Sequence, residues 1–270
     1  MSLYVVSDKE ELTKLAYHMI LGVIHSKKEV TLGLATGSSP EGIYEMFRKS
    51  RPDVSHVTTV NLDEYIGLPA DHEQSYAYFM KTQLFDHLNF KETHIPDGMN
   101  PDHEAECARY DAILAANVPD LQLLGIGNNG HIAFNEPVTD FELRTHVEEL
   151  TQDTIDANSR FFETPDEVPT SAYTMGIKSI MEAEQILLIA MGTSKAEAIK
   201  AMVEGPVTEA MPASILKNHP NVTVLVDREA ASLLEAVQNS SGGCGGGCCG
   251  DHHGSDNHSS GGCGSGGGCG

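Results

Sequence analysis

Two stretches of the sequence contain residues that can transfer protons. In GIGNNGHIAFNEP (125–137), His131 and Glu136 stand five residues apart. Histidine titrates near neutral pH and can move a proton to or from a substrate oxygen, while a neighbouring carboxylate can orient the imidazole and fix its tautomer. Asn129-Gly130 can turn the chain so that His131 faces a ligand. Because Asn-Gly also marks ordinary turns, the stretch alone allows a purely structural interpretation.

The second such stretch, NLDEYIGL, places Asp63 and Glu64 directly after the apolar run HVTTVNL (56–62). A carboxylate at the end of a strand can act as a general base if it is partly desolvated. Aspartate is also a common helix cap, and so Asp63 alone predicts either role.

Two further stretches are suited to binding an anion. GLATGSSPEG contains Thr36, Gly37, Ser38 and Ser39. Small residues before a helix start let the backbone approach an anion, and the hydroxyls add donors, although the stretch matches neither GxGxxG nor a Walker A loop. MGTSKAEA places Lys195 in the first turn of a helix, where a cation is unfavourable unless an anion lies nearby. Gly-Ser turns and solvated lysines are also common structural features.

The elements that must position these residues alternate between short apolar runs and helical patterns. Strands are expected at LYVVS (3–7), VTLGLA (30–35), HVTTVNL (56–62), LQLLGIG (121–127), QILLIAM (185–191) and VTVLV (222–226). Helices are expected from Lys9 to Ser26, from Pro40, from Ser75 to about Leu88, from Asn100-Pro101, and near Ser194 and Asp227. The alternation predicts one α/β domain over residues 1–239, with a doubly wound, mostly parallel, Rossmann-like sheet and helices on both faces. Ligands of such sheets bind beyond the carboxyl ends of the strands, where all four stretches fall.

Composition restricts the partners and the compartment. The formal net charge of −22 argues against nucleic acid and anionic membrane surfaces, although a local cation and backbone N–H groups can still bind a small phosphate. No apolar run approaches the roughly 20 residues of a bilayer span, and the start of the chain lacks a signal-peptide pattern. Residues 1–239 contain a single cysteine, Cys107, which fits a reducing compartment. A cytoplasmic protein is therefore expected.

Residues 240–270 differ in kind from the rest of the chain. They contain five cysteines and three histidines among Gly, Ser, Asp and Asn, and no aliphatic or aromatic residue. Such a segment cannot form a core and is expected to be a disordered tail. Loose binding of a soft metal is an alternative, but the spacings match no structural zinc pattern, and we assign no metal site.

Taken together, the motifs resemble the glucosamine-6-phosphate deaminase family, which shares its fold with 6-phosphogluconolactonase. The resemblance runs from about Leu3 to Leu234 through LGLATGSSP, VNLDEYIGL, QSYAYFM, LGIGNNGHIAFNEP, ANSRFFE, MGTSKAEAI, GPVTEAMPASILKNHP and VTVLVD. It implies a reaction without a cofactor, in which D-glucosamine 6-phosphate and water give D-fructose 6-phosphate and ammonia.

The resemblance also implies catalytic roles. Asp63 corresponds to the base that moves a proton between C2 and C1, and His131 to the residue that opens the pyranose ring, working with Glu136. Many members have Asp where this chain has Asn129. An amide can hold the imidazole through a hydrogen bond but cannot stabilise imidazolium with a charge.

The phosphate contacts implied by the resemblance are the TGSS loop around Ser38 and Ser39, Arg160 of NSRFF, and Lys195. Members that assemble as allosteric hexamers carry basic residues after FNEP and a longer C-terminal extension. Here His146 and Glu148 stand at the matching places. The chain thus resembles the short, monomer-like members, and a monomer or small homo-oligomer is expected.

Two other functions are compatible with parts of this pattern. A 6-phosphogluconolactonase-type hydrolase would share the fold, but that family typically follows its Gly-His with Thr-Ala and lacks LDEY. A non-enzymatic sugar-phosphate sensor would be expected to bring a helix-turn-helix segment and a basic face, and neither is visible in the sequence.

Overall fold

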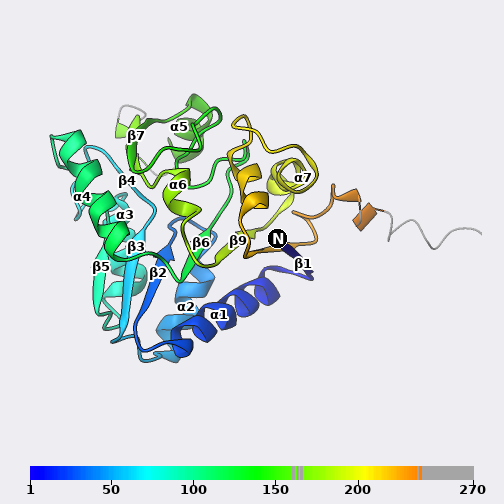
Figure 1. The fold of residues 1–270 in the computed structure, drawn as a ribbon, viewed down its shortest axis with the longest axis horizontal. Helices are drawn as coiled ribbons and strands as arrows, with labels where there is room; N and C mark the ends of the chain where they lie inside the picture. The colour runs from blue at the N-terminus through cyan, green and yellow to red at the C-terminus, as the bar shows by residue number, and fades with distance from the viewer. Residues whose placement is uncertain (160–161, 163, 165–166, 236, 239–270) are drawn as a thin grey trace, which may run out of the picture.

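The computed structural model describes residues 1–159, 162, 164, 167–235 and 237–238 (Figure 1). The predicted phosphate ligand Arg160 and the predicted tail 240–270 lie outside the described residues, and both remain predictions.

A seven-stranded parallel sheet forms the centre of the described chain. Its strand order is β1 (Ser2–Val6), β10 (Val222–Asp227), β9 (Ile186–Ala190), β6 (Leu121–Leu124), β2 (Val30–Leu34), β3 (Val57–Asn61) and β5 (Glu92–His94). Every neighbouring pair is parallel, which confirms the predicted α/β class. All residues of β3, β6 and β9 are buried, as expected where helices cover both faces. Of the strands in this sheet, the sequence analysis missed β5, whose residues ETH form no apolar run.

The helices α1 (Lys9–Ser26) and α2 (Glu41–Ser50) pack side by side (Figure 1). The helix α1 has the predicted bounds because Asp8 caps it, its carboxylate accepting the Glu11 N–H at 2.9 Å. The helices α1 and α2 belong to crossovers that run across the sheet from the β1 side towards β5. The helices α4 (His103–Ala116) and α7 (Ala196–Glu204) belong to crossovers that run the other way, from β5 towards β1. Right-handed crossovers therefore place α4 and α7 on the opposite face from α1 and α2.

The direction of the chain across the sheet reverses between β2 and β6. From β2 the chain proceeds to β3 and β5, and from β6 to β9 and β10. In open parallel sheets, such a reversal leaves a crevice beyond the carboxyl ends of the two strands. The loops that leave β2 and β6 are the TGSS and GIGNNG stretches.

A second, antiparallel sheet was not predicted. It consists of β4 (Asp63–Tyr65), β8 (Ser171–Thr174) and β7 (His146–Glu149), with β8 in the centre. These strands have three or four residues each, too short for alternation to mark them. This small sheet lies in the upper part of the view in Figure 1 and carries Asp63.

Three predicted helix boundaries were wrong. The helix expected at Asn100-Pro101 begins at His103, because the Asp102 carboxylate accepts the Ala105 N–H and caps it. The helix capped by Ser75 is α-helical only over α3 (Tyr76–Met80) and continues as the π-helix η1 (Lys81–Phe85). Residues 228–233 form turns rather than the helix expected near Asp227, although the Asp227 carboxylate accepts the Ala230 N–H as a capping residue would; it also accepts the Gly192 N–H.

The remaining elements are α5 (Gln152–Ser159), α6 (Ile177–Ile180) and the 3-10 helices η3 (Thr193–Lys195) and η4 (Pro212–Asn218). Within the described ranges, no helix is long and apolar enough to cross a bilayer.

Candidate active site

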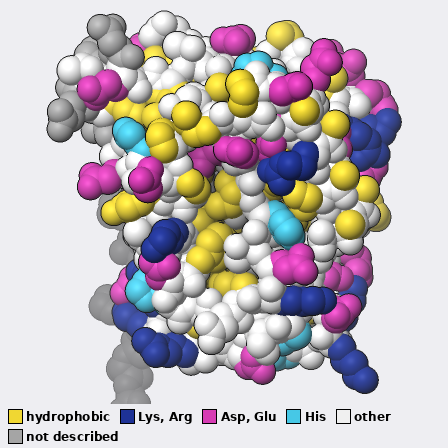
Figure 2. Space-filling view, turned by 90° about the vertical axis from the view of Figure 1, so that its left-hand side faces the viewer, with side chains coloured by type: hydrophobic (Ala, Val, Ile, Leu, Met, Phe, Trp, Pro, Cys, Tyr) yellow, Lys and Arg dark blue, Asp and Glu magenta, His cyan; other side chains and the backbone are white. Residues whose placement is uncertain are grey.

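A cavity of about 850 Å³ lies beyond the carboxyl ends of the central strands. Its walls come from the loops after β2 and β6, from β4, and from α3 and η3. Seen from the side, the molecule has a hollowed face with hydrophobic side chains inside the hollow and charged side chains around it (Figure 2). Each of the four predicted stretches contributes residues to the cavity.

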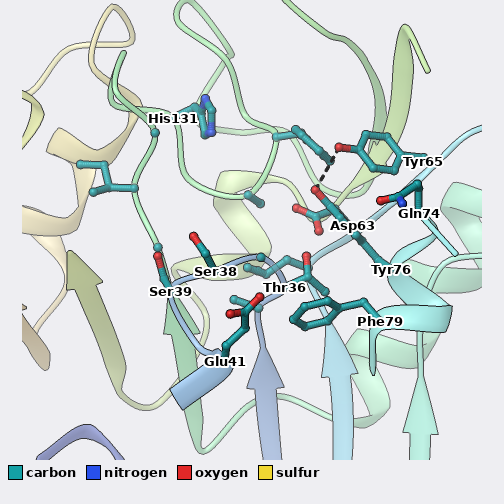
Figure 3. Close-up of a pocket in the computed structure, with 18 of the residues that line it drawn as sticks. Thr36, Ser38, Ser39, Glu41, Asp63, Tyr65, Gln74, Tyr76, Phe79 and His131 are labelled. Carbon is teal, nitrogen blue, oxygen red and sulfur yellow. Dashed lines mark hydrogen bonds between the residues drawn. The ribbon is translucent and has the colours of Figure 1, made fainter. Parts of the chain in front are cut away.

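Asp63 faces this cavity from the first position of β4. The side chains of Asp63, Ser38 and His131 line the same cavity (Figure 3). Only 6% of Asp63 is exposed, and no group among the described residues hydrogen-bonds to its carboxylate. Burial, reinforced by the charge of Glu64, raises the pKa of Asp63 to about 8. An unpartnered carboxylate that faces a cavity can exchange a proton with a ligand, and above this pKa it is ionised and can act as a base.

Glu64 turns away from the cavity although it follows Asp63 directly. Its carboxylate accepts the backbone N–H groups of Tyr65, Tyr76 and Ala77 at 2.8–2.9 Å. Burial raises the pKa of Glu64 to about 7, and the three N–H donors oppose this increase. Glu64 therefore joins β4 to the start of α3, whereas Asp63 alone is available to a ligand.

The glycines of GIGNNG make space for His131. A Cβ atom on Gly127 would lie 2.4 Å from Cε1 of His131, so the imidazole packs directly on this part of the backbone. Gly130 has φ +87°, a conformation that favours glycine, and its N–H closes a turn onto the Gly127 carbonyl at 3.0 Å. The turn and the close approach together aim His131 at the cavity, as the sequence predicted.

Glu136 lies behind His131, outside the residues that line the cavity. It is 2% exposed, and its Oε2 lies 3.5 Å from Nδ1 of His131. The same oxygen accepts the Nδ2 amide of Asn129 at 2.7 Å, and Oδ1 of Asn129 accepts the His131 backbone N–H at 3.1 Å. Asn129 thus holds both Glu136 and the His131 backbone, and Nδ1 of the imidazole has no hydrogen-bond partner among the described residues. Of these three residues, His131 and Asn129 line the cavity.

The predicted phosphate loop forms another wall. Thr36, Gly37, Ser38 and Ser39 all line the cavity, and so does Lys195 of η3, which follows β9. Gly37 has φ +85°, so this turn also requires a glycine. Hydroxyl groups, backbone near a helix start and one lysine are a suitable set of ligands for a phosphate.

An aromatic wall completes the cavity and was missed by the sequence analysis. Tyr65, Tyr76 and Phe134 line it, with the rings of Tyr76 and Phe134 stacked at 5.9 Å between centroids and 6° between planes. The hydroxyls of Tyr76 and Tyr65 are 3.3 Å apart (Figure 3). The spacing of QSYAYFM indicates a helix but not which face meets a ligand.

No group of three potential metal ligands occurs in the part of the chain that the structure describes. The side chains present can bind an anion at one wall and exchange protons at another. Fold and site together define a class of α/β proteins with acid–base groups and an anion-binding loop at the topological switch point.

Comparison with known proteins identifies the family within this class. Residues 8–225 match the model of the glucosamine-6-phosphate isomerases/6-phosphogluconolactonase family, and the chain belongs to this family. The chain is 59% identical over 238 residues to the glucosamine-6-phosphate deaminase of Bacillus cytotoxicus, covering 88% of this chain and 91% of that protein. It is 58% identical, with the same coverage, to the enzyme of the same name from Bacillus thuringiensis strain Al Hakam.

Solved structures give the same result. The chain is similar to a monomeric glucosamine-6-phosphate deaminase of the NagB superfamily, with a TM-score of 0.84 and 45% identity over 86% of this chain and all of the other. A 6-phosphogluconolactonase from Leishmania guyanensis has a TM-score of 0.70 at 20% identity, covering 86% of this chain and 98% of the other. This second likeness shows a shared fold only.

Proposed function

We propose that the protein converts D-glucosamine 6-phosphate and water into D-fructose 6-phosphate and ammonia. One observation carries the proposal: the buried carboxylate of Asp63 faces a cavity lined by His131 and the TGSS loop, and has no hydrogen-bond partner in the described chain. The relatives named as glucosamine-6-phosphate deaminases support the same reaction.

Binding begins at the phosphate. The hydroxyls of Ser38 and Ser39 and the ammonium of Lys195 hold it, together with Arg160, which remains a proposal from the sequence. Anchoring the phosphate at one wall leaves the sugar carbons near Asp63 and His131, which converts the later steps into reactions within one complex.

Ring opening requires a proton to move from the anomeric hydroxyl to the ring oxygen. His131 is placed to exchange this proton because its imidazole lines the cavity, while Glu136 orients the ring and stabilises its protonated form. The product of this step is an open amino aldose with a carbonyl at C1.

Isomerisation follows at C1 and C2. The C1 carbonyl acidifies the C2 proton, and Asp63 removes it to form an enolamine. Asp63 then returns the proton to C1, which leaves an imine at C2; water adds there and ammonia departs. A carboxylate with a raised pKa holds the proton between the two transfers better than an ordinary aspartate would.

Substrate, compartment and assembly belong to the same proposal. The family and the anion-binding wall support a sugar phosphate as the substrate. A cytoplasmic location and a monomer or small homo-oligomer agree with the sequence, and the likeness to a monomeric deaminase supports the smaller assembly. No role is proposed for nucleic acid or a membrane.

Ammonia release from D-glucosamine 6-phosphate, coupled to a dehydrogenase that consumes ammonia, tests the proposal. We expect turnover with this substrate and much weaker turnover with glucosamine, which lacks the phosphate. Hydrolysis of 6-phosphogluconolactone without ammonia release would instead favour the lactonase function.

A further inference from the structure

The end of β8 contacts both segments that carry the proposed catalytic residues. Thr174 is the register partner of Asp63 across the β4–β8 pair. Met175 follows it, and its backbone N–H donates to the carbonyl of Leu62, the residue before Asp63, at 2.7 Å. The chain next to the base is therefore fixed to residue 175.

Thr174 and Met175 also bind the loop between His131 and Glu136. The Oγ1 of Thr174 accepts the Phe134 backbone N–H at 3.0 Å. The Met175 carbonyl accepts Nδ2 of Asn135 at 2.9 Å, and this amide also donates to the Ile132 carbonyl. Phe134 and Asn135 are the residues just before Glu136, so the loop between His131 and Glu136 is bound at two points, to Thr174 and to Met175.

All these contacts are shielded from water. Thr174, Met175 and Asn135 are each 0% exposed. A buried N–H group that loses its acceptor finds no water to replace it. The bond between Phe134 and Thr174 therefore strongly favours the observed position of the loop against Thr174. Hydrogen bonds of this kind specify geometry as well as stability.

We propose that Thr174 is a positioning residue, whose hydroxyl, together with the Met175 backbone, fixes the His131 loop relative to Asp63. We name the two residues the Thr174–Met175 bridge. The inference rests on the proposed function, in which one sugar meets His131 and Asp63 in succession. A displacement of about 1 Å between such groups can reduce turnover a hundredfold.

The Thr174–Met175 bridge matters most in a reaction in which His131 and Asp63 act on the same substrate molecule. Deamination starts from a closed pyranose and needs ring opening at His131 before proton transfer at Asp63. Exchange of a C1 proton of D-fructose 6-phosphate starts from an open keto form and needs Asp63 alone. Loosening the bridge should therefore impair deamination more than exchange, whereas general damage to the fold would impair both alike.

The test is Thr174→Val, which keeps the shape and removes the acceptor, beside Thr174→Ser, which keeps the hydroxyl. Thr59→Val is a matched control, because Thr59 is also 0% exposed and its Oγ1 has no hydrogen-bond partner within the described chain. We expect Thr174→Val to lower kcat for deamination about tenfold or more, with KM within about twofold and C1-proton exchange within about threefold of wild type. Thr174→Ser and Thr59→Val should resemble wild type.

Each outcome decides the inference. If wild type releases ammonia and Thr174→Val behaves like Thr59→Val, or loses both activities equally, the bridge does not position the loop. If Thr174→Val does not fold, Thr174→Ala replaces it: slow deamination with preserved exchange, restored in Thr174→Ser, supports the bridge, and any other pattern overturns it. A wild-type protein without ammonia release overturns the proposed function itself, and the role of the bridge in this reaction with it.

Discussion

The Nδ2 amide of Asn129 lies 2.7 Å from Oε2 of Glu136, whereas Nδ1 of His131 lies 3.5 Å from the same oxygen. Asn129 therefore makes the shorter contact with this buried carboxylate, and Nδ1 of His131 has no hydrogen bond of ordinary length among the described residues. The amide fixes the oxygen against which His131 rests. Glu136 carries the negative charge of this trio, because Asn129 is neutral.

We expect Glu136→Gln to slow deamination of D-glucosamine 6-phosphate about tenfold or more, because it removes the charge that favours imidazolium while keeping the side-chain shape. C1-proton exchange from D-fructose 6-phosphate should be much less impaired, since the open keto form needs no ring opening. Fixed-time assays of released ammonia measure deamination, and NMR of the C1 protons in deuterated water measures the exchange. An equal loss in both would mean that Glu136 serves isomerisation or only stabilises the loop.

Asp63→Asn should lower kcat by roughly 10²–10⁴-fold while changing substrate binding little, because it removes the base and keeps its volume. Incorporation of deuterium from solvent at C1 of the sugar reports the proton transfer directly. The amide is an appropriate isostere here because no group among the described residues donates to the carboxylate. Deuterium incorporation at the wild-type rate would remove Asp63 from the role of base.

The same substitution should change stability in a pH-dependent way. The pKa of Asp63 is about 8 in the folded protein, raised mainly by burial, and the unfolded chain has an ordinary value near 3.8. Between these two values the folded state retains a proton that the unfolded state releases, so wild-type stability falls as the pH increases. Asp63→Asn does not titrate.

We therefore expect the melting temperature of Asp63→Asn to exceed that of wild type by an amount that grows from pH 5 to pH 8. Calorimetry of both proteins in the same buffers measures the difference. A constant difference across this range would show that Asp63 is ionised in the folded protein.

Lys195→Ala should raise KM for D-glucosamine 6-phosphate roughly tenfold to a hundredfold, as expected for loss of a charge-assisted contact of about 1.5–3 kcal/mol. Lys200→Ala is the matched control, because Lys200 lies on α7 just after η3 and pairs with Glu204 at 4.0 Å. Unphosphorylated glucosamine gives the second comparison. A similar loss of activity on glucosamine would show that Lys195 acts on something other than the phosphate.

Much of the site could be predicted from the sequence because of a rule of parallel sheets. The chain after β2, β3, β6 and β9 must emerge at one edge, so Ser38, Asp63, His131 and Lys195 meet although they are far apart in the sequence. The pattern also gave the bounds of α1, where the capping residue and the apolar spacing agree.

Other features depend on contacts that no local pattern encodes. Asp63 and Glu64 are adjacent and chemically alike, yet one faces the cavity and the other binds three backbone N–H groups of β4 and α3. Which of the two side chains faces the cavity depends on the pairing of β4 with β8, a strand more than a hundred residues away in the sequence. The aromatic wall likewise requires the distant Tyr76 and Phe134 to stack.

Gly127 provides the most direct test of how the histidine is aimed. Its φ is outside the range that only glycine tolerates, so alanine is compatible with the backbone, but the added Cβ would lie 2.4–2.5 Å from three atoms of the His131 ring. A Cβ atom essentially never lies this close to a heavy atom to which it is not bonded, and the imidazole must therefore move.

Gly127→Ala should consequently lower kcat for deamination about tenfold or more. Binding of the phosphate should change little, because the TGSS loop and Lys195 lie on other walls of the cavity. Gly22→Ala is the control: a Cβ there would meet nothing within 4 Å, and alanine inside α1 should stabilise the protein by about 0.5–1 kcal/mol. Steady-state kinetics and melting curves of both variants separate a displaced imidazole from an unfolded chain. A folded Gly127→Ala protein with wild-type kcat would mean that His131 can leave its observed position without loss, and that its placement against Gly127 does not contribute to ring opening.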